Sequence, residues 1–188
     1  MLYIISEKPK TGLISIIIVA VWFLLEVVSV NTTGFIFSTA KENPLNLGIV
    51  FASTFGLVLL FVLVNFLITA IFNGNGTFFE IFKVVAVALI PYIITRFIRL
   101  IMTNFCTLGE QSFITIVITI GLLWSLLILL IGLSQIHEFS ALCTVGCFLF
   151  TVLGMALVVF LLLLVSSVVA QIVQFVKDIW SEFLCIIS

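Results

Sequence analysis

The sequence predicts an all-α, polytopic membrane protein built as a bundle of five transmembrane helices. Of the 188 residues, 64% are hydrophobic and only 8% are charged, whereas a soluble domain carries about 25% charged residues. So few polar groups could not cover the surface of a soluble domain. The apolar residues also form continuous runs, which excludes membrane-spanning strands because those alternate apolar and polar residues. The formal net charge of −1 provides no basic field, so we expect no nucleic-acid partner.

Five apolar runs reach the length of about 20 residues that a helix needs to cross a bilayer. They are Gly12–Val30, Leu45–Phe72, Phe78–Asn104, Ser112–Leu133 and Leu142–Val176. Together they predict one transmembrane domain over residues 1–188. The first run is longer than the apolar core of a signal peptide, so we predict an uncleaved span. Lys8 and Lys10 precede it and favour a cytoplasmic N-terminus.

Helix-start signals stand between the runs. Asn43-Pro44 offers an N-cap followed by a proline at the first helical position. Thr77 to Glu80 and Thr107 to Glu110 both read as capping boxes. The segment Asn73–Gly76 contains two glycines that permit the positive φ of a tight turn. We therefore predict a short hairpin between the second and third helices.

Charged and amide side chains inside the apolar runs form the first candidate site. Counted along antiparallel spans, five of them fall at similar depth near the outer face: Glu26, Arg96, Arg99, Gln171 and Gln174. A charge in hydrocarbon costs at least about 2.5–3.5 kcal/mol, and an ion pair reduces that cost. We predict that Glu26 pairs with Arg96. Arg99 lies nearer the helix end, which favours snorkelling to the interface instead.

Pro91 stands in the middle of the third run, where it removes one helical hydrogen bond and predicts a kinked or broken helix. Small residues recur at four-residue spacing in the second run, at Gly48, Ala52 and Gly56. Gly121 and Ser125 repeat that spacing in the fourth. Such stripes let helices approach closely. For the first stripe we favour packing inside the bundle over a contact between copies of the chain.

His137 and Glu138 are the residues that most resemble a catalytic pair, and they lie between the fourth and fifth runs. A zinc site would combine His137 with Cys143 and Cys147, but this spacing matches no standard zinc motif. Cysteines in a membrane helix also serve as small apolar residues. We expect no metal, no cofactor and no enzymatic activity.

Three stretches carry a family resemblance: NGNGTFFEIFKVVAVALIPYI (Asn73–Ile93), LWSLLILLIGLSQIHEFS (Leu123–Ser140) and the run from Thr151 to Glu182. Together they resemble the Yip domain family of Ypt/Rab-interacting-type membrane proteins, and most closely its bacterial branch. The resemblance implies a five-helix membrane domain with a cytoplasmic N-terminus. In eukaryotic relatives it implies roles in vesicle traffic through partner proteins. In the bacterial branch it implies an accessory role beside solute-uptake transporters.

Three functions follow as hypotheses. The first is a scaffold or accessory subunit of a bacterial cell membrane that binds lipids and other integral membrane proteins, such as a transporter complex, or a second copy of itself. The second is a small channel or transporter that uses Glu26, Arg96 and Arg99. The third is a membrane enzyme or metal site at His137 and Glu138.

Overall fold

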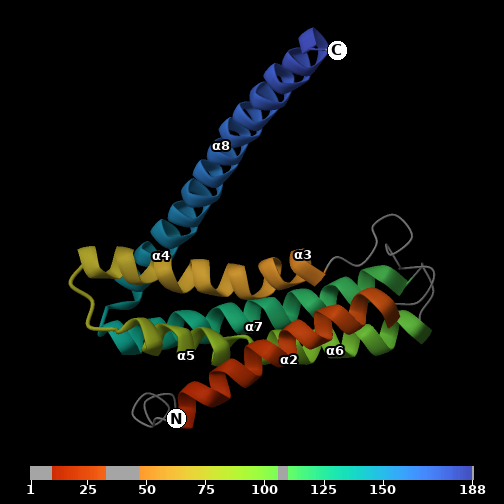
Figure 1. Cartoon of the computed structure of the whole chain (residues 1–188). Coiled ribbons are helices and arrows are strands. Elements are labelled where there is room, and N and C mark those ends of the chain that lie inside the picture. Colours follow the sequence, from red (N-terminus) through yellow and green to blue (C-terminus); the bar gives the residue numbers. More distant parts are fainter. Residues whose placement is uncertain (1–9, 33–46, 106–109, 188) are drawn as a thin grey trace. The chain divides into compact units, whose positions relative to one another are not determined.

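The computed structural model describes residues 10–32, 47–105 and 110–187, and all regular structure in these ranges is helical. The elements are α2 (Lys10–Thr32), α3 (Leu47–Phe51), the π-helical turn η1 (Ala52–Gly56), α4 (Leu57–Ile71), α5 (Phe78–Ala88), α6 (Ile90–Phe105), α7 (Gln111–His137) and α8 (Ala141–Ile187) (Figure 1). Within these ranges, five stretches are long and apolar enough to cross a membrane, with α3–η1–α4 as one and α5–α6 as another. The predicted all-α polytopic membrane fold is confirmed.

The chain forms two compact units, Met1–Thr151 and Val152–Ser188. The first unit contains α2 to α7 and the opening turns of α8. The second unit is the rest of α8, a continuous helix that runs past the predicted end at Val176 as far as Ile187. Its described side chains from Leu157 onward are almost all exposed.

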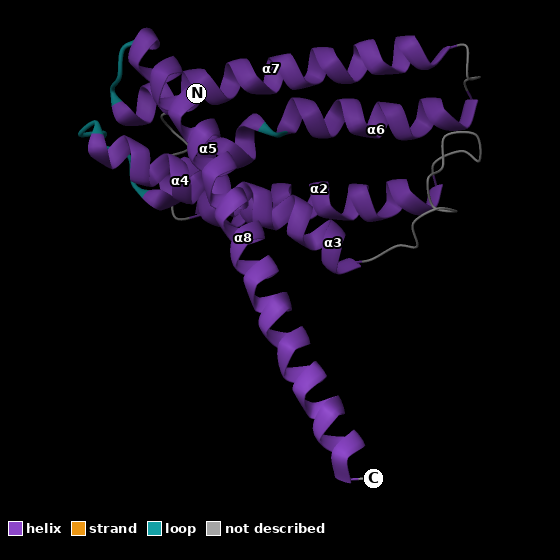
Figure 2. Cartoon of the chain, turned by 90° about the horizontal axis from the view of Figure 1, so that it is seen from above, coloured by secondary structure: helices purple, strands orange, loops and turns teal. Residues whose placement is uncertain are grey.

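The core of the first unit lies around α5. This helix contacts α2, α4 and α7, and its continuation α6 contacts α2 and α7. Figure 2 shows α6 and α7 running side by side. Ile81, Val84 and Val85 of α5 are buried, together with Val19 of α2 and Val62 of α4. Helix α5 is the first half of the third predicted span. Because it contacts three other helices, it is the central helix of the first unit.

The opening turns of α8 contact α4 through one polar contact and one aromatic pair. Asn65 Nδ2 donates to Thr151 Oγ1 at 3.0 Å between buried side chains. The rings of Phe61 and Phe148 lie 6.1 Å apart. An amide in an apolar span needs a hydrogen-bond partner inside the protein. A buried contact of Asn65 could therefore have been predicted from the sequence.

The α4–α5 connection is the predicted short hairpin, and its capping box is present. Glu80 Oε2 accepts the Thr77 N–H at 2.9 Å and the Thr77 hydroxyl at 2.8 Å. The reason given for the glycines was wrong, however. Asn73 supplies the positive φ of 57°, and no described glycine has a positive φ.

Two other predicted helix starts include residues outside the described ranges. Asn43-Pro44 lies outside the described residues, and so does Thr107. Helix α7 begins only at Gln111, with Glu110 as its N-cap and no side-chain cap bond. Because Thr107 lies outside the described residues, the predicted box of Thr107 and Glu110 stays a prediction.

The third span is interrupted where the proline predicts a break. Helix α5 ends at Ala88 and α6 begins at Ile90, with Pro91 in the first turn of α6. A neighbouring helix satisfies one carbonyl at the break, because Ser125 Oγ of α7 donates to the carbonyl of Ala88, the last residue of α5, at 2.5 Å. Hydroxyls of adjacent helices commonly satisfy backbone groups freed in this way.

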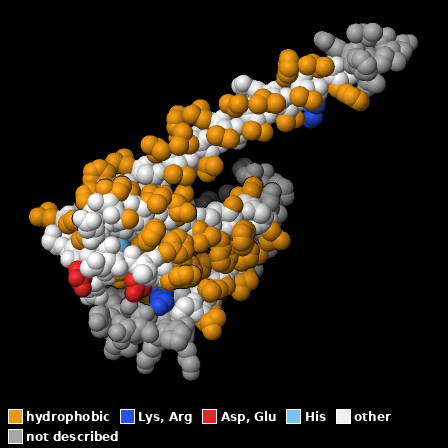
Figure 3. Space-filling view, turned by 60° about the vertical axis from the view of Figure 1, so that its left-hand side comes forward, with side chains coloured by type: hydrophobic (Ala, Val, Ile, Leu, Met, Phe, Trp, Pro, Cys, Tyr) orange, Lys and Arg blue, Asp and Glu red, His pale blue; other side chains and the backbone are white. Residues whose placement is uncertain are grey.

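The surface of the described helices is mainly hydrophobic. Exposed leucine, isoleucine, valine and phenylalanine side chains occur on every long helix. In the space-filling view of Figure 3 they cover much of the visible surface, and charged side chains are few. A hydrocarbon environment suits such a surface, so the polar groups held inside the bundle stand out as candidates for function.

Candidate functional site

The centre of the candidate site is an ion pair between α2 and α6. Arg96 Nη2 donates to both carboxylate oxygens of Glu26, and the side chains are only 16% and 18% exposed. The two helices run in parallel here, since Trp22 also meets Tyr92 edge-on with ring centroids 6.2 Å apart. The structure therefore brings Glu26 and Arg96 together at one depth, as the residue count predicted.

Two aromatic residues, Trp22 and Tyr92, contact the Glu26–Arg96 pair. Trp22 Nε1 donates to Glu26 Oε1 at 3.2 Å. The guanidinium carbon of Arg96 lies 5.8 Å from the centre of the Tyr92 ring, within cation–π range. Trp22 precedes Glu26 by one helical turn, a spacing that places them on one face. Trp22 was not among the predicted site residues, although its spacing from Glu26 indicates such a contact.

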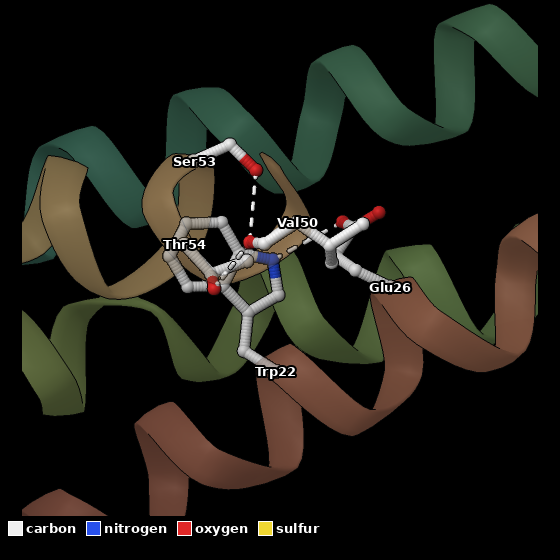
Figure 4. Close-up of a pocket in the computed structure, with 5 residues that line it drawn as sticks. All are labelled: Trp22, Glu26, Val50, Ser53 and Thr54. Atoms are coloured by element: carbon white, nitrogen blue, oxygen red, sulfur yellow. Dashed lines mark hydrogen bonds between the residues drawn. The ribbon is translucent and has the colours of Figure 1, made fainter. Parts of the chain in front are cut away.

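A cavity of about 260 Å³ lies beside Glu26 and is lined by Trp22, Glu26, Val50, Ser53 and Thr54. Figure 4 shows Trp22 and Glu26 reaching from α2 toward the segment of α3 and η1 that carries the other three residues. The hydroxyls of Ser53 and Thr54 both donate to the Val50 carbonyl, at 3.0 Å and 2.8 Å. Their lone pairs and the carboxylate leave the cavity rich in acceptors.

The helix beside this cavity is distorted. Residues Ala52–Gly56 form a π-helical turn between α3 and α4. Such turns are rare and often mark functional sites. The hydroxyl-to-carbonyl bonds of Ser53 and Thr54 compete with the regular ladder, which gives a local reason for the distortion.

The other members of the predicted cluster lie apart from the pair. Arg99 is one turn further along α6 and lines a second cavity near the start of α7. Gln171 and Gln174 belong to the second unit, where both are exposed. Their place beside Glu26 stays a prediction.

The stripe of small residues in the second span does not face the helices of the first unit. Gly48, Ala52 and Gly56 are exposed, and a Cβ added at Gly56 would meet nothing within 4 Å. Instead Thr54, which is 2% exposed, turns inward. Residues two apart lie on opposite sides of a helix, so Thr54 is buried where Ala52 and Gly56 are exposed. The described helices of the first unit do not support packing of the stripe inside the bundle, which stays a prediction.

Close helix packing occurs along α7 instead. A Cβ added at Gly121 would overlap the Thr95 side chain, and one added at Gly132 would lie 2.5 Å from Val84 Cγ1. Ser125 lies between these glycines and donates to Ala88. Gly121 and Ser125 were recognised from their spacing. Gly132 was missed, although it follows Ser125 by two turns on the same face.

His137 ties the α4–α5 turn to the end of α7. Its side chain is 3% exposed, and its Nδ1 accepts the Gly76 N–H at 3.3 Å. The Phe139 ring stacks on the imidazole at 5.4 Å. A Cβ added at Gly74 or Gly76 would come within 2.6 Å of the imidazole, so the turn needs glycines for space. Glu138 Oε2 accepts from Asn75 Nδ2 at 3.3 Å and joins the same two segments.

The residues considered for zinc do not form a ligand set. No three His, Cys, Asp or Glu side chains within the described ranges are grouped so that they could hold a metal ion. Cys143 and Cys147 are free thiols on α8. His137 Nε2 is buried without a hydrogen-bond partner in the described structure.

Comparison with known proteins identifies the family of this chain. The chain matches no curated protein and no solved structure. The model of the Yip1 domain family matches residues 3–164, which covers α2 to α7, the Glu26–Arg96 pair, the His137 contacts and more than half of α8. The match agrees with the resemblance carried by the glycine turn, the proline run and the segment around His137. This multi-pass membrane protein therefore belongs to the Yip1 domain family.

Proposed function

We propose that this protein is a non-enzymatic integral membrane scaffold or accessory subunit that binds other membrane proteins. The observation that carries the proposal is the exposed stripe of Gly48, Ala52 and Gly56. Small residues let a second helix approach the backbone closely, and that is how helices associate where lipid removes the hydrophobic driving force. Exposed bulky side chains flank the stripe, such as Ile49 and Leu57, and they can pack around an incoming helix.

The proposed partner is an integral membrane protein of a solute-uptake transporter complex, in a bacterial cell membrane with the N-terminus of this chain in the cytoplasm. Lys8 and Lys10 before the first span support that orientation. A second copy of the chain is the alternative occupant of the stripe.

The test is co-purification from native membranes in mild detergent, followed by mass spectrometry. Ala52→Leu and Gly56→Leu should each remove the same membrane-protein partner that the unaltered chain retains. Gly146→Leu is the matched control, because a Cβ there also meets nothing within 4 Å. Equal recovery with all variants would rule out the stripe as the contact. Loss of a self-dimer alone would identify the stripe as a homodimer seam.

The cavity beside Glu26 supports a second candidate, a small channel or transporter. A paired carboxylate next to a cavity of about 260 Å³ could bind a cation or a polar solute. In proteoliposomes, a conducting protein should release a trapped cation or proton gradient, and Glu26→Gln should slow that release. A scaffold should leave the gradient intact with either sequence.

A further inference from the structure

A second cavity lies between α6 and α7 at the end where α6 finishes and α7 begins. Its volume is about 200 Å³, and it is lined by Arg99, Thr103, Gln111, Ile114, Thr115 and Ile118. None of these residues lines the cavity beside Glu26. We call this cavity the Arg99 pocket.

Arg99 carries the positive charge of the Arg99 pocket, and none of the described residues that line this pocket is a carboxylate. The carboxylate of Glu26 is engaged by Arg96, so Arg96, Arg99 and Glu26 together carry a net charge of +1. Among the residues that the structure describes, none forms a hydrogen bond or ion pair with Arg99. An unbalanced guanidinium at the edge of hydrocarbon favours an anion brought by a ligand.

The hydrogen-bonding groups around Arg99 suit an acceptor-rich ligand. The hydroxyls of Thr103 and Thr115 already donate to the Leu100 and Gln111 carbonyls, at 3.1 Å and 3.0 Å. The donors that remain among the lining residues are the Arg99 guanidinium and the Gln111 side-chain amide. A phosphate group accepts from such donors, and guanidinium binds it in bidentate fashion.

Depth and lining favour a lipid over a soluble anion. Arg99 lies six residues before the end of α6 at Phe105, a rise of roughly 9 Å, so its long side chain is within reach of the headgroup layer. Ile114 and Ile118 form the apolar side of the pocket. A free phosphate would gain nothing from those two side chains, whereas the glycerol and upper acyl chain of a lipid would pack on them.

We propose that the Arg99 pocket binds the phosphate of an anionic phospholipid, with the lipid's acyl chain along Ile114 and Ile118. Basic pockets between transmembrane helices are a known physical basis for selecting anionic lipids. The inference concerns a lipid ligand and does not depend on which partner the small-residue stripe binds.

Native mass spectrometry of the full chain, released from micelles that contain either phosphatidylglycerol or phosphatidylcholine, tests the proposal. The unaltered protein should retain phosphatidylglycerol preferentially. Arg99→Gln should weaken that retention at least about tenfold, the scale expected for losing a charge-assisted contact, and Arg99→Lys should restore part of it. Lys177→Gln is the matched control, because it removes an equal charge from an exposed position in the second unit.

Gln111→Ala is a second variant that removes one donor from the pocket without changing the charge, and it should weaken retention less than Arg99→Gln. It keeps the test valid if Arg99→Gln does not fold. Equal retention by the unaltered chain, Arg99→Gln and Gln111→Ala would overturn the proposal. Displacement of the lipid by inorganic phosphate as readily as by more phosphatidylglycerol would overturn the assignment to a lipid and indicate a pocket for a soluble anion.

Discussion

Arg96 of α6 donates to both carboxylate oxygens of Glu26 in α2, 70 residues earlier in the chain. The contact joins two helices that run in parallel, and both of its side chains are largely buried. Removing one member would leave the other charge without its partner, a situation that costs about 3–5 kcal/mol in buried pairs of soluble proteins. Partial exposure of the two side chains, 16% and 18%, makes that range an upper value here.

Glu26→Gln and Arg96→Gln should each lower the free energy of unfolding, and the double variant should cost less than the sum of the two. The reason is that the second change removes a charge that the first has already left unpaired. Equilibrium unfolding in mixed micelles, followed by tryptophan fluorescence, measures this coupling. Lys177→Gln combined with Glu26→Gln is the control and should be additive. An additive result for the pair itself would mean that the ion pair contributes nothing.

Gly132→Ala should destabilise the contact between α7 and α5, because the new Cβ would lie 2.5 Å from Val84 Cγ1. Overpacking of this kind typically costs about 1–3 kcal/mol. Val84→Ala should rescue part of the loss, since the remaining Val84 Cβ is 3.5 Å from the added atom. Thermal unfolding of the single and double variants measures both effects.

Gly146→Ala is the matched control for that experiment, because nothing lies within 4 Å of its added Cβ. Alanine is the better helix former by about 1 kcal/mol, so this variant should be neutral or more stable. If Gly132→Ala behaves in the same way, the close approach of α5 and α7 is not a constraint on the fold.

The sequence suffices for much of this fold because each span is a continuous apolar run that is long enough to cross a membrane. The end of the last helix is the exception, since α8 continues past Val176 to Ile187. The depth of Glu26 and Arg96 can be counted along those spans, which is why their meeting can be predicted. The rotation of each helix about its axis cannot be counted. That rotation decides that Thr54 is buried while Ala52 and Gly56, on the opposite side of the helix, are exposed.

The same limit explains the glycines of the α4–α5 turn. A glycine cluster predicts a turn, and the turn is there. The reason that Gly74 and Gly76 are needed is the His137 ring, which lies more than 60 positions along the chain from Gly76 in a contact that only the tertiary packing creates. Local rules therefore place the turn correctly and give the wrong cause for its composition.

His137→Phe should destabilise the protein by about 1–3 kcal/mol, because the phenyl ring can still stack on Phe139 but leaves the buried Gly76 N–H without an acceptor. His137→Asn should cost less, since its amide oxygen can accept the same hydrogen bond. Hydrogen exchange at Gly76 provides the local measurement, with faster exchange expected for the phenylalanine variant. Equal exchange in both variants would show that Nδ1 does not hold the turn.

Ser125→Ala should weaken the broken span specifically, because the Ser125 hydroxyl donates to the carbonyl of Ala88, the last residue of α5. Hydrogen bonds between membrane helices average about 0.6 kcal/mol and reach about 1.7 kcal/mol, and a carbonyl at a helix end next to a proline has few other donors. We expect a loss of about 1 kcal/mol in unfolding free energy. Ser166→Ala is the control, since that hydroxyl donates only to Leu163 of its own helix in an exposed position. Equal stability of the two variants would mean that water or the backbone satisfies Ala88 without α7, and the compensation of the Pro91 break would then lie within the third span itself.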